Sequence, residues 1–287
     1  MREILDVHTH CFAGTGDAPA VTRGIAALSA IGVRGLVTVG LVNAHLEPAH
    51  AWRIVPEWVE HRGDPSLHEA QDLLAFASAN APAILPFVDT RHLWGEDVPA
   101  LLGEYLAQGF RGLKGLYLAE EPNDLGVASI PSALGISKEA YHRREWEIFA
   151  FARDHGLPVI YHMDARRHGD VMAAILQDFP TVRFDFPHFG ISRRAFARIL
   201  EHHPNAFTDV ASMLPHLRQD PAGYRDFLCA HADRVCFGSD AFLYRLETVG
   251  EYVDAVEGMG LPPEVRDSVF TVNPRRFLGP ALGAPLS

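Results

Sequence analysis

Histidine and aspartate side chains of the kind that bind metal ions follow several short apolar runs of the sequence. The first run ends in the motif Asp-Val-His-Thr-His, and because side chains alternate along a strand, its His8 and His10 project to the same side. Two imidazoles on one side can bind a single ion. Three later runs end in His162, His188 and Asp240. Neutral imidazoles together with a carboxylate suit Zn²⁺ best, and Mn²⁺ or Fe²⁺ is also compatible with them.

These residues need a scaffold that brings distant strand ends together, and the chain has the pattern of a parallel barrel. Apolar, partly β-branched runs alternate with stretches of helical periodicity throughout the 287 residues. The expected strands are 4–7, 35–41, 83–88, 112–116, 158–162, 182–186, 206–210 and 235–238. The expected helices are 21–31, 67–79, 98–108, 138–155, 170–179, 193–203, 221–232 and 246–256, with Ser137 and Ser192 as N-caps.

Alternating units of this kind predict an α/β fold in which helices cover a parallel sheet. Eight of them predict one domain, residues 1–287, folded as a (β/α)8 TIM barrel. A doubly wound open sheet is the alternative architecture, but no GxGxxG or Walker-type loop follows any early strand.

Two connections are too long for simple loops. After the second strand, residues 42–65 are predicted to form an extra helix beside the barrel mouth, because apolar residues recur there at helical spacing, at Trp52, Val55, Trp58 and Val59. Residues 119–136 are rich in Gly and Pro and lack periodicity, so we expect a loop that closes over the mouth. Short C-terminal helices are expected over residues 262–278.

The carboxyl ends of all the strands meet at one face of such a barrel, where catalytic residues stand. At these ends the sequence resembles the amidohydrolase superfamily, in particular its amidohydrolase-related branch of TIM-barrel hydrolases and zinc decarboxylases. The resemblance covers nearly the whole chain and rests on residues 6–10 (DVHTH), 112–115 (GLKG), 161–162 (YH), 188–190 (HFG), 237–240 (FGSD) and 273–279 (NPRRFLG).

The resemblance also implies roles for individual residues. It implies a metal-binding set of four, which is His8, His10, His162 and Asp240. It further implies that His188 either binds a second ion or polarises the reacting group.

Lys114, one of only two lysines in the chain, stands at the end of the fourth strand. Three roles stay open for it: a carbamate that bridges two metal ions, as in binuclear members of the superfamily, a cation that holds a substrate anion, and a structural ion pair. We favour the substrate cation and a mononuclear site. Arginines follow neighbouring strands, and guanidinium groups commonly hold carboxylates. We therefore expect a small carboxylated substrate, bound by Lys114, Arg91, Arg167 and Arg194.

The expected reaction is hydrolysis of a lactone, amide or ester by a metal-activated water. Asp240 would take the proton of the water and pass it to the leaving group, while His188 hydrogen-bonds the developing oxyanion. A zinc-dependent non-oxidative decarboxylase would use the same residues and is the first alternative.

Two further alternatives are a phosphoesterase and a non-catalytic binding protein that has kept the barrel. Phosphoesterases with a similar first motif usually close on a Gly-Ser-Asp-Ala-His type of segment, whereas here Phe242 follows Asp240 and Ala241. TatD-like DNases usually place a glutamate on the fourth strand, where this chain has Lys114.

Composition limits the partners and the compartment. A formal net charge of −11 repels phosphate backbones, so nucleic acid is not an expected partner. The three cysteines form no CxxC pair, which indicates neither a disulfide framework nor a thiolate metal site. The first residues lack an apolar signal region, and no window reaches the roughly 20 apolar residues that span a bilayer. We expect a cytoplasmic protein without membrane association; a homodimer stays open.

Overall fold

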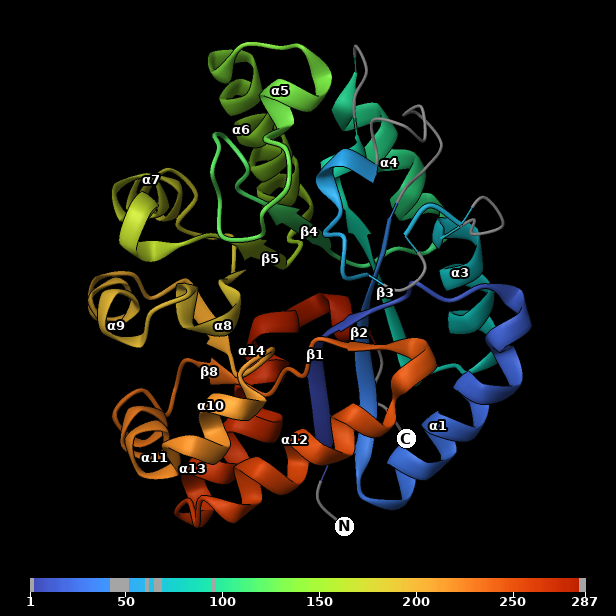
Figure 1. Cartoon of the computed structure of the whole chain (residues 1–287), viewed down its shortest axis with the longest axis vertical. Helices are drawn as coiled ribbons and strands as arrows, with labels where there is room; N and C mark the ends of the chain where they lie inside the picture. The colour runs from blue at the N-terminus through green and yellow to red at the C-terminus, as the bar shows by residue number, and fades with distance from the viewer. Residues whose placement is uncertain (1–2, 42–51, 60–61, 65–68, 94–96, 284–287) are drawn as a thin grey trace.

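The paired strands of the computed structural model all run parallel and form one sheet (Figure 1). The structure describes residues 3–41, 52–59, 62–64, 69–93 and 97–283. The strands are β1 (Ile4–His10), β2 (Val33–Leu41), β3 (Ile84–Asp89), β4 (Leu113–Leu116), β5 (Val159–His162), β6 (Phe184–Asp185), β7 (Ala206–Asp209), β8 (Val235–Cys236) and β9 (Ala241–Phe242). Their order is β8-β7-β6-β5-β4-β3-β2-β1-β9.

The last two short strands bring the sheet back to the first. β9 pairs with β1. Just after β8, the backbone N–H of Val7 donates to the carbonyl of Phe237 at 2.9 Å, and the N–H of Asp240 donates to the carbonyl of His8 at 2.8 Å. The sheet is therefore a (β/α)8 barrel, as the sequence predicts, with its eighth strand interrupted beside β1.

Helices lie around the outside of the strands (Figure 1). They are α1 (Ala18–Ala30), α3 (Glu69–Ala79), α4 (Val98–Gln108), α5 (Ile130–Leu134), α6 (Lys138–His155), α7 (Ala165–Asp178), α8 (Pro187–Gly190), α9 (Arg193–His202), α10 (Leu214–Gln219), α11 (Pro221–Ala230), α12 (Glu247–Gly258), α13 (Pro263–Asp267) and α14 (Asn273–Leu278). The predicted caps are confirmed, since the Ser137 and Ser192 hydroxyls accept the N–H groups of Ala140 and Ala195. None of the helices within the described ranges is long and apolar enough to cross a membrane.

The strands are buried on both faces, which explains why they read as continuous apolar runs. Side chains such as Val37, Phe87, Ile160 and Phe207 fill the barrel interior in a cluster separate from the larger core beneath the helices. The predicted short terminal helices are confirmed, and α14 adds Phe277 and Leu278 to the interior cluster.

The two long connections differ in part from their predictions. In the described part of 42–65, Trp52–Ile54 forms one 3-10 turn, and residues 55–59 and 62–64 form only bends and turns. The extra helix predicted from Trp52, Val55, Trp58 and Val59 is therefore wrong for these residues, and residues 42–51, 60–61 and 65 lie outside the described part of the chain. Residues 119–136 are not wholly irregular, because they contain α5, whose first turn is capped by Ser129. Proline at the start of that helix and Gly135 at its end restrict it to five residues.

We predict that Gly112→Ala destabilises the barrel. An added Cβ at Gly112 would lie 2.3 Å from a ring carbon of Phe87, which is fully buried, so the ring or the strand must shift. Overpacking of this kind costs about 1–3 kcal/mol, which is measurable as a lower urea midpoint. Gly103→Ala is the matched control, because nothing lies within 4 Å of its added Cβ and alanine favours helix α4. Equal midpoints for both variants would contradict the packing argument.

Candidate functional site

A bulge in β1 aims its histidines into the barrel. Between two successive pairings with β2, β1 advances three residues, from Asp6 to Thr9, whereas β2 advances only two. As a result Val7 packs in the interior cluster, and the next residue, His8, also faces the interior, where it contacts Lys114 of β4. His10 follows on the same side as His8, as the alternation predicts.

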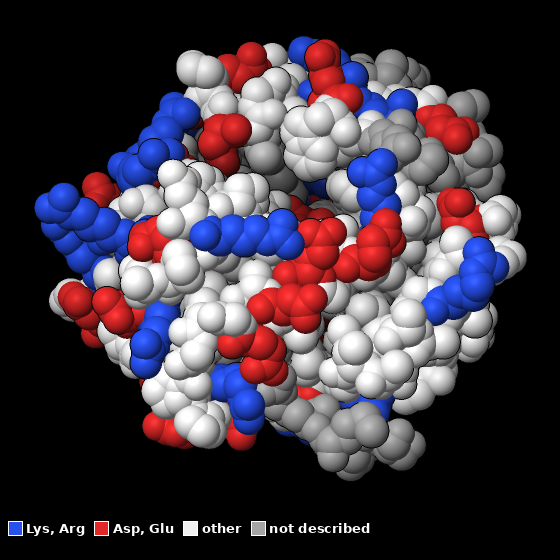
Figure 2. All heavy atoms as spheres, turned by 60° about the horizontal axis from the view of Figure 1, so that its bottom comes forward, with Lys and Arg blue, Asp and Glu red and all other residues white. Residues whose placement is uncertain are grey.

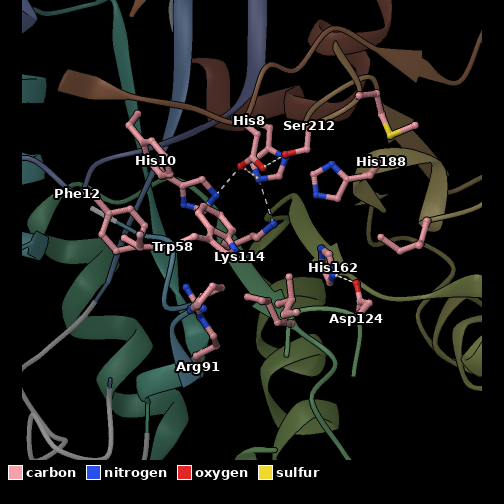
Figure 3. A pocket seen from close by; sticks show the side chains of 18 residues that line it. His8, His10, Phe12, Trp58, Arg91, Lys114, Asp124, His162, His188 and Ser212 are labelled. Atoms are coloured by element: carbon pink, nitrogen blue, oxygen red, sulfur yellow. Dashed lines mark hydrogen bonds and ion pairs between the residues drawn. The ribbon is translucent and has the colours of Figure 1, made fainter. Parts of the chain in front are cut away.

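Two histidines, His8 and His10 (Figure 3), and one aspartate bring three metal-binding atoms together. Atoms of His8, His10 and Asp240 all lie within 4.8 Å of one another. Asp240 Oδ1 is 2.9 Å from His10 Nε2 and 3.4 Å from His8 Nε2. Burial favours the neutral form of Asp240, but His8 and the hydrogen bond from His10 hold its pKa well below its usual range. Two imidazole nitrogens and one carboxylate oxygen fit a divalent ion.

Asp240 reaches this position through a strained backbone between β8 and β9. Its φ is 61°, in the left-handed region that a non-glycine residue rarely adopts. Its own N–H donates to the carbonyl of His8, and the hydroxyl of Ser212 donates to Oδ2. Ser212 has a φ of 51°, so both partners of this hydrogen bond have a left-handed backbone. The bond occupies Oδ2, which leaves Oδ1 facing the two histidines.

Asp209 at the end of β7 fixes His8 from behind. The fully buried carboxylate accepts the Nδ1–H of His8 at 2.9 Å and the backbone N–H of His188 at 3.0 Å. Burial opposes its charge, but His8 and these hydrogen bonds keep its pKa below the usual value. Gly238 allows the approach, since a Cβ there would lie 2.8 Å from Asp209 Oδ2. With Nδ1 protonated, His8 presents the lone pair of Nε2 to the site.

His188, like His8, is held through its Nδ1. Its Nδ1 lies 2.8 Å from the carbonyl of Ala211, which can only accept, so Nδ1 carries the proton and Nε2 the lone pair. Burial lowers the pKa of His188 to about 4, and its ring is therefore neutral. The ring stacks on His8 with centroids 5.5 Å apart. A neutral His188 in this orientation can accept a proton or bind an ion through Nε2, but it has no second N–H for an oxyanion.

His162 lines the same cavity but pairs with a different residue. Its Nε2 is 2.7 Å from Asp124 Oδ2, a short distance typical of a charge-assisted hydrogen bond. Asp124 sits on the 119–136 connection, which is fastened by the Asn123 side chain through bonds to the backbone of Val127. His162 is not part of the three-atom cluster, so the structure brings together three of the four predicted metal-binding residues.

Lys114 lies at the floor of the cavity, almost fully buried. Its Nζ is 3.1 Å from His8 Nε2. Burial lowers the pKa of Lys114, while the carboxylates of Asp240, Asp209 and Asp89 raise it. The net result is a pKa below the usual value, and the amine of Lys114 faces both the metal-binding atoms and the cavity.

The three arginines lie in different surroundings. Arg91 lines the cavity, but its guanidinium is paired with Asp89, with the nearest atoms 2.6 Å apart, and it also donates to the carbonyl of Ile54. Arg167 donates to the carbonyl of Pro122 and lies 3.5 Å from Glu120, and Arg194 is exposed. Neither Arg167 nor Arg194 is among the described residues that line the cavity.

The cavity has a volume of about 300 Å³, at the lower end of the range for small-molecule sites. Its polar lining consists of nine described residues: His8, His10, Arg91, Lys114, Asp124, His162, His188, Ser212 and Asp240. Its other side is apolar and includes the aromatic rings of Phe12, Trp58 and Phe242.

Sequence reasoning missed three residues of this site. Asp209 stands at the carboxyl end of β7. The rule that catalytic side chains stand at strand ends, which found the predicted metal-binding residues, would have found it too. Asp124 and Ser212 lie in connections without periodicity, and no sequence signal marks them.

Comparison with solved structures finds the same fold in distant proteins. An uncharacterised TIM-barrel protein from Bordetella bronchiseptica is 19% identical, with 97% of this chain and 99% of that chain covered and a TM-score of 0.64. A probable 2-pyrone-4,6-dicarboxylic acid hydrolase from Acinetobacter baumannii, with citric acid bound, is 13% identical (96% and 99% covered, TM-score 0.62). A mutant organophosphorus hydrolase from Deinococcus radiodurans is 14% identical (97% and 93% covered, TM-score 0.60).

A comparison with curated proteins found no match. The family model described as Amidohydrolase matches residues 6–279, from the Asp-Val-His-Thr-His motif to the end of the last α-helix. Since that span is nearly the whole chain and contains every residue of the cavity's polar side, the chain belongs to the amidohydrolase family.

Proposed function

We propose that the chain is a divalent-metal-dependent hydrolase that acts on a lactone, amide or ester of a small carboxylated molecule. The observation that carries this proposal is the convergence of His8, His10 and Asp240 beside Lys114 in one cavity. A structural neighbour described as a dicarboxylic acid hydrolase holds citric acid, which supports a carboxylated ligand.

His8, His10 and Asp240 would hold the ion, for which we expect zinc on the basis of the nitrogen-rich donor set. Activation of a water and polarisation of the substrate carbonyl are the chemistry that such an ion supplies. His162, the fourth predicted ligand, is paired through Nε2 with Asp124, so the proposal rests on the other three residues.

Two residues of the chain are suited to move the proton. The carboxylate of Asp240 is ionised, and Ser212 hydrogen-bonds its Oδ2, so that Oδ1 faces the two histidines. Asp240 would therefore take a proton from the attacking water and give it to the leaving atom. His188 Nε2 is the second proton acceptor. Lys114 replaces His188 as the donor for a developing negative charge, because its ammonium has three N–H groups and His188 has none free.

Lys114 also supplies the positive charge for a substrate carboxylate. Acidic residues gather in the middle of the face shown in Figure 2, and the chain as a whole is acidic, so the surface does not attract anions. Recognition of an anion therefore depends on the cations of the cavity itself.

We predict that the purified protein holds one divalent ion per chain, and that His8→Ala or Asp240→Ala removes it. Each variant deletes one of the three donors of the cluster. Elemental analysis of protein prepared without added metal measures the effect, and circular dichroism checks the fold. His202→Ala is the control, since this exposed histidine hydrogen-bonds only within its own helix. Full occupancy in both site variants would refute the assignment.

We predict that Lys114→Met weakens binding of a carboxylated substrate by about one to two orders of magnitude. A charge-assisted hydrogen bond contributes about 1.5–3 kcal/mol to binding, and the variant loses it. KM values for acids and for their uncharged methyl esters measure this, with metal content checked in each preparation. Lys138→Met is the matched control, because Lys138 lies on the surface against Glu120.

The function itself is tested by turnover of the metal-loaded protein on lactones, amides and hydroxybenzoates. Ring opening or acid release is scored separately from carbon dioxide. Carbon dioxide release alone would replace the hydrolase with the decarboxylase. If methyl esters react as well as their acids, the carboxylated substrate is wrong.

A further inference from the structure

Three aromatic rings form a rim cluster, Phe12, Trp58 and Phe242, on the apolar side of the cavity. Phe12 and Phe242 meet edge to face with centroids 5.6 Å apart, and Trp58 lies 6.4 Å from Phe242. Phe12 belongs to a small apolar cluster at the mouth, separate from both larger core clusters. The rings are therefore not part of the packing that holds the barrel together.

Trp58 is unusual in its exposure. Its side chain is 65% exposed, and it is one of three large apolar residues that are exposed in the described part of the chain. The other two, Ile31 and Val272, do not line the cavity. An exposed indole at the edge of a binding cavity offers a flat apolar surface that is free to contact a ligand.

Phe12 is held in place at an energetic cost. Its φ is 38°, in the left-handed region, which is a true outlier for a bulky residue. Such strain persists only where the surroundings enforce it, and it concentrates at functional sites. Phe12 is 4% exposed, and its ring lies against His10 with centroids 5.8 Å apart.

The rim cluster begins directly beside the metal-binding atoms. The His10 ring lies 6.1 Å from the ring of Phe242, and His10 Nε2 is 2.9 Å from Asp240 Oδ1. Phe242 is supported from behind by Tyr244, which stacks on it at 5.3 Å with an interplanar angle of 6°. His10 therefore contacts both the rim cluster and the carboxylate of Asp240, with no further residue between them.

We propose that the rim cluster is the binding subsite for one planar, unsaturated ring of the substrate, attached directly to the group that reacts. A cavity of about 300 Å³ holds one ring with its substituents. A long flexible linker is excluded because the aromatic surface adjoins His10. The identity of the reacting group rests on the proposed function, whereas the preference for a planar ring does not.

The test compares probes that differ in the ring alone. Benzoate and cyclohexanecarboxylate have the same charge and carbon count, and benzamide and cyclohexanecarboxamide are their neutral counterparts. Calorimetric titration of the metal-loaded wild type should show the planar member of at least one pair binding about three- to tenfold more tightly, as expected for aromatic contacts. Trp58→Leu and Phe242→Leu should bring that ratio towards one. Trp146→Leu, which alters a ring on α6 outside the cavity lining, should leave it unchanged.

The outcomes separate the two proposals. Three outcomes would overturn the ring subsite. The first is an affinity ratio near one in the wild type, the second is a ratio that neither rim variant changes, and the third is no measurable binding of any probe. Ring preference without turnover of any ester, lactone or amide supports the subsite and refutes the hydrolase. Thermal unfolding of the Leu variants should change little, because both rings lie outside the main core.

Discussion

The carboxylate of Asp209 is the constraint on which the site depends. It is fully buried, and a buried charge is tolerated only when its hydrogen-bonding capacity is filled. The groups that fill it come from three parts of the barrel, the ring of His8 on β1, the backbone N–H of His188 after β6, and that of Ala211 after β7 itself. A rearrangement of any one of these segments would remove one of the donors from a buried charge, so this one group ties the carboxyl ends of several strands together.

This rigidity explains how the chain maintains so many unfavourable backbone conformations at one end. The described non-glycine residues with positive φ are Phe12, His188, Phe189, Ile191, Ser212 and Asp240. All of them follow barrel strands at their carboxyl ends, and each such residue costs about 1–3 kcal/mol. The interior cluster and the outer helices, which are regular, offset this cost. The strained residues therefore lie at the candidate site. There the placement of side chains for function outweighs the local loss of stability.

The sequence predicts those parts of the protein that follow from periodicity. Strands, helices and the pairing of His8 with His10 follow from side-chain alternation, and Asp240 follows from the rule that barrel chemistry stands at strand ends. The bulge in β1 could not be predicted, because it depends on how β1 packs against its neighbours.

The side-chain contacts of the site could not be predicted from the sequence for the same reason, because they depend on tertiary packing. Asp124 and Ser212 occupy connections whose course is set by tertiary contacts, such as the bonds of Asn123 to Val127. The orientation of His188, which turns a predicted oxyanion donor into an acceptor, depends on one carbonyl group of Ala211. Arg167 lies near the expected place but turns to Pro122 and Glu120, and no pattern in the sequence reports a side-chain direction of this kind.

Under the proposed function, the charges around the cavity would couple metal binding to anion binding. Among the described residues that line the cavity, Asp240 and Asp124 are ionised and the charge of Arg91 is offset by Asp89. Lys114 is the other lysine or arginine of this lining, and burial lowers its pKa. A divalent ion at His8, His10 and Asp240 would add positive charge to this lining and so favour the entry of an anion. Lys114 Nζ lies 3.1 Å from His8 Nε2, so a protonated Lys114 would repel an ion held by His8.

A carboxylate placed between the ammonium and the ion relieves this repulsion and is attracted by both. By linkage, each ligand then raises the affinity of the other by the same factor. If the site holds the proposed ion, the buried Lys114 beside His8, His10 and Asp240 would thus make the binding of the ion and the binding of an anion depend on each other.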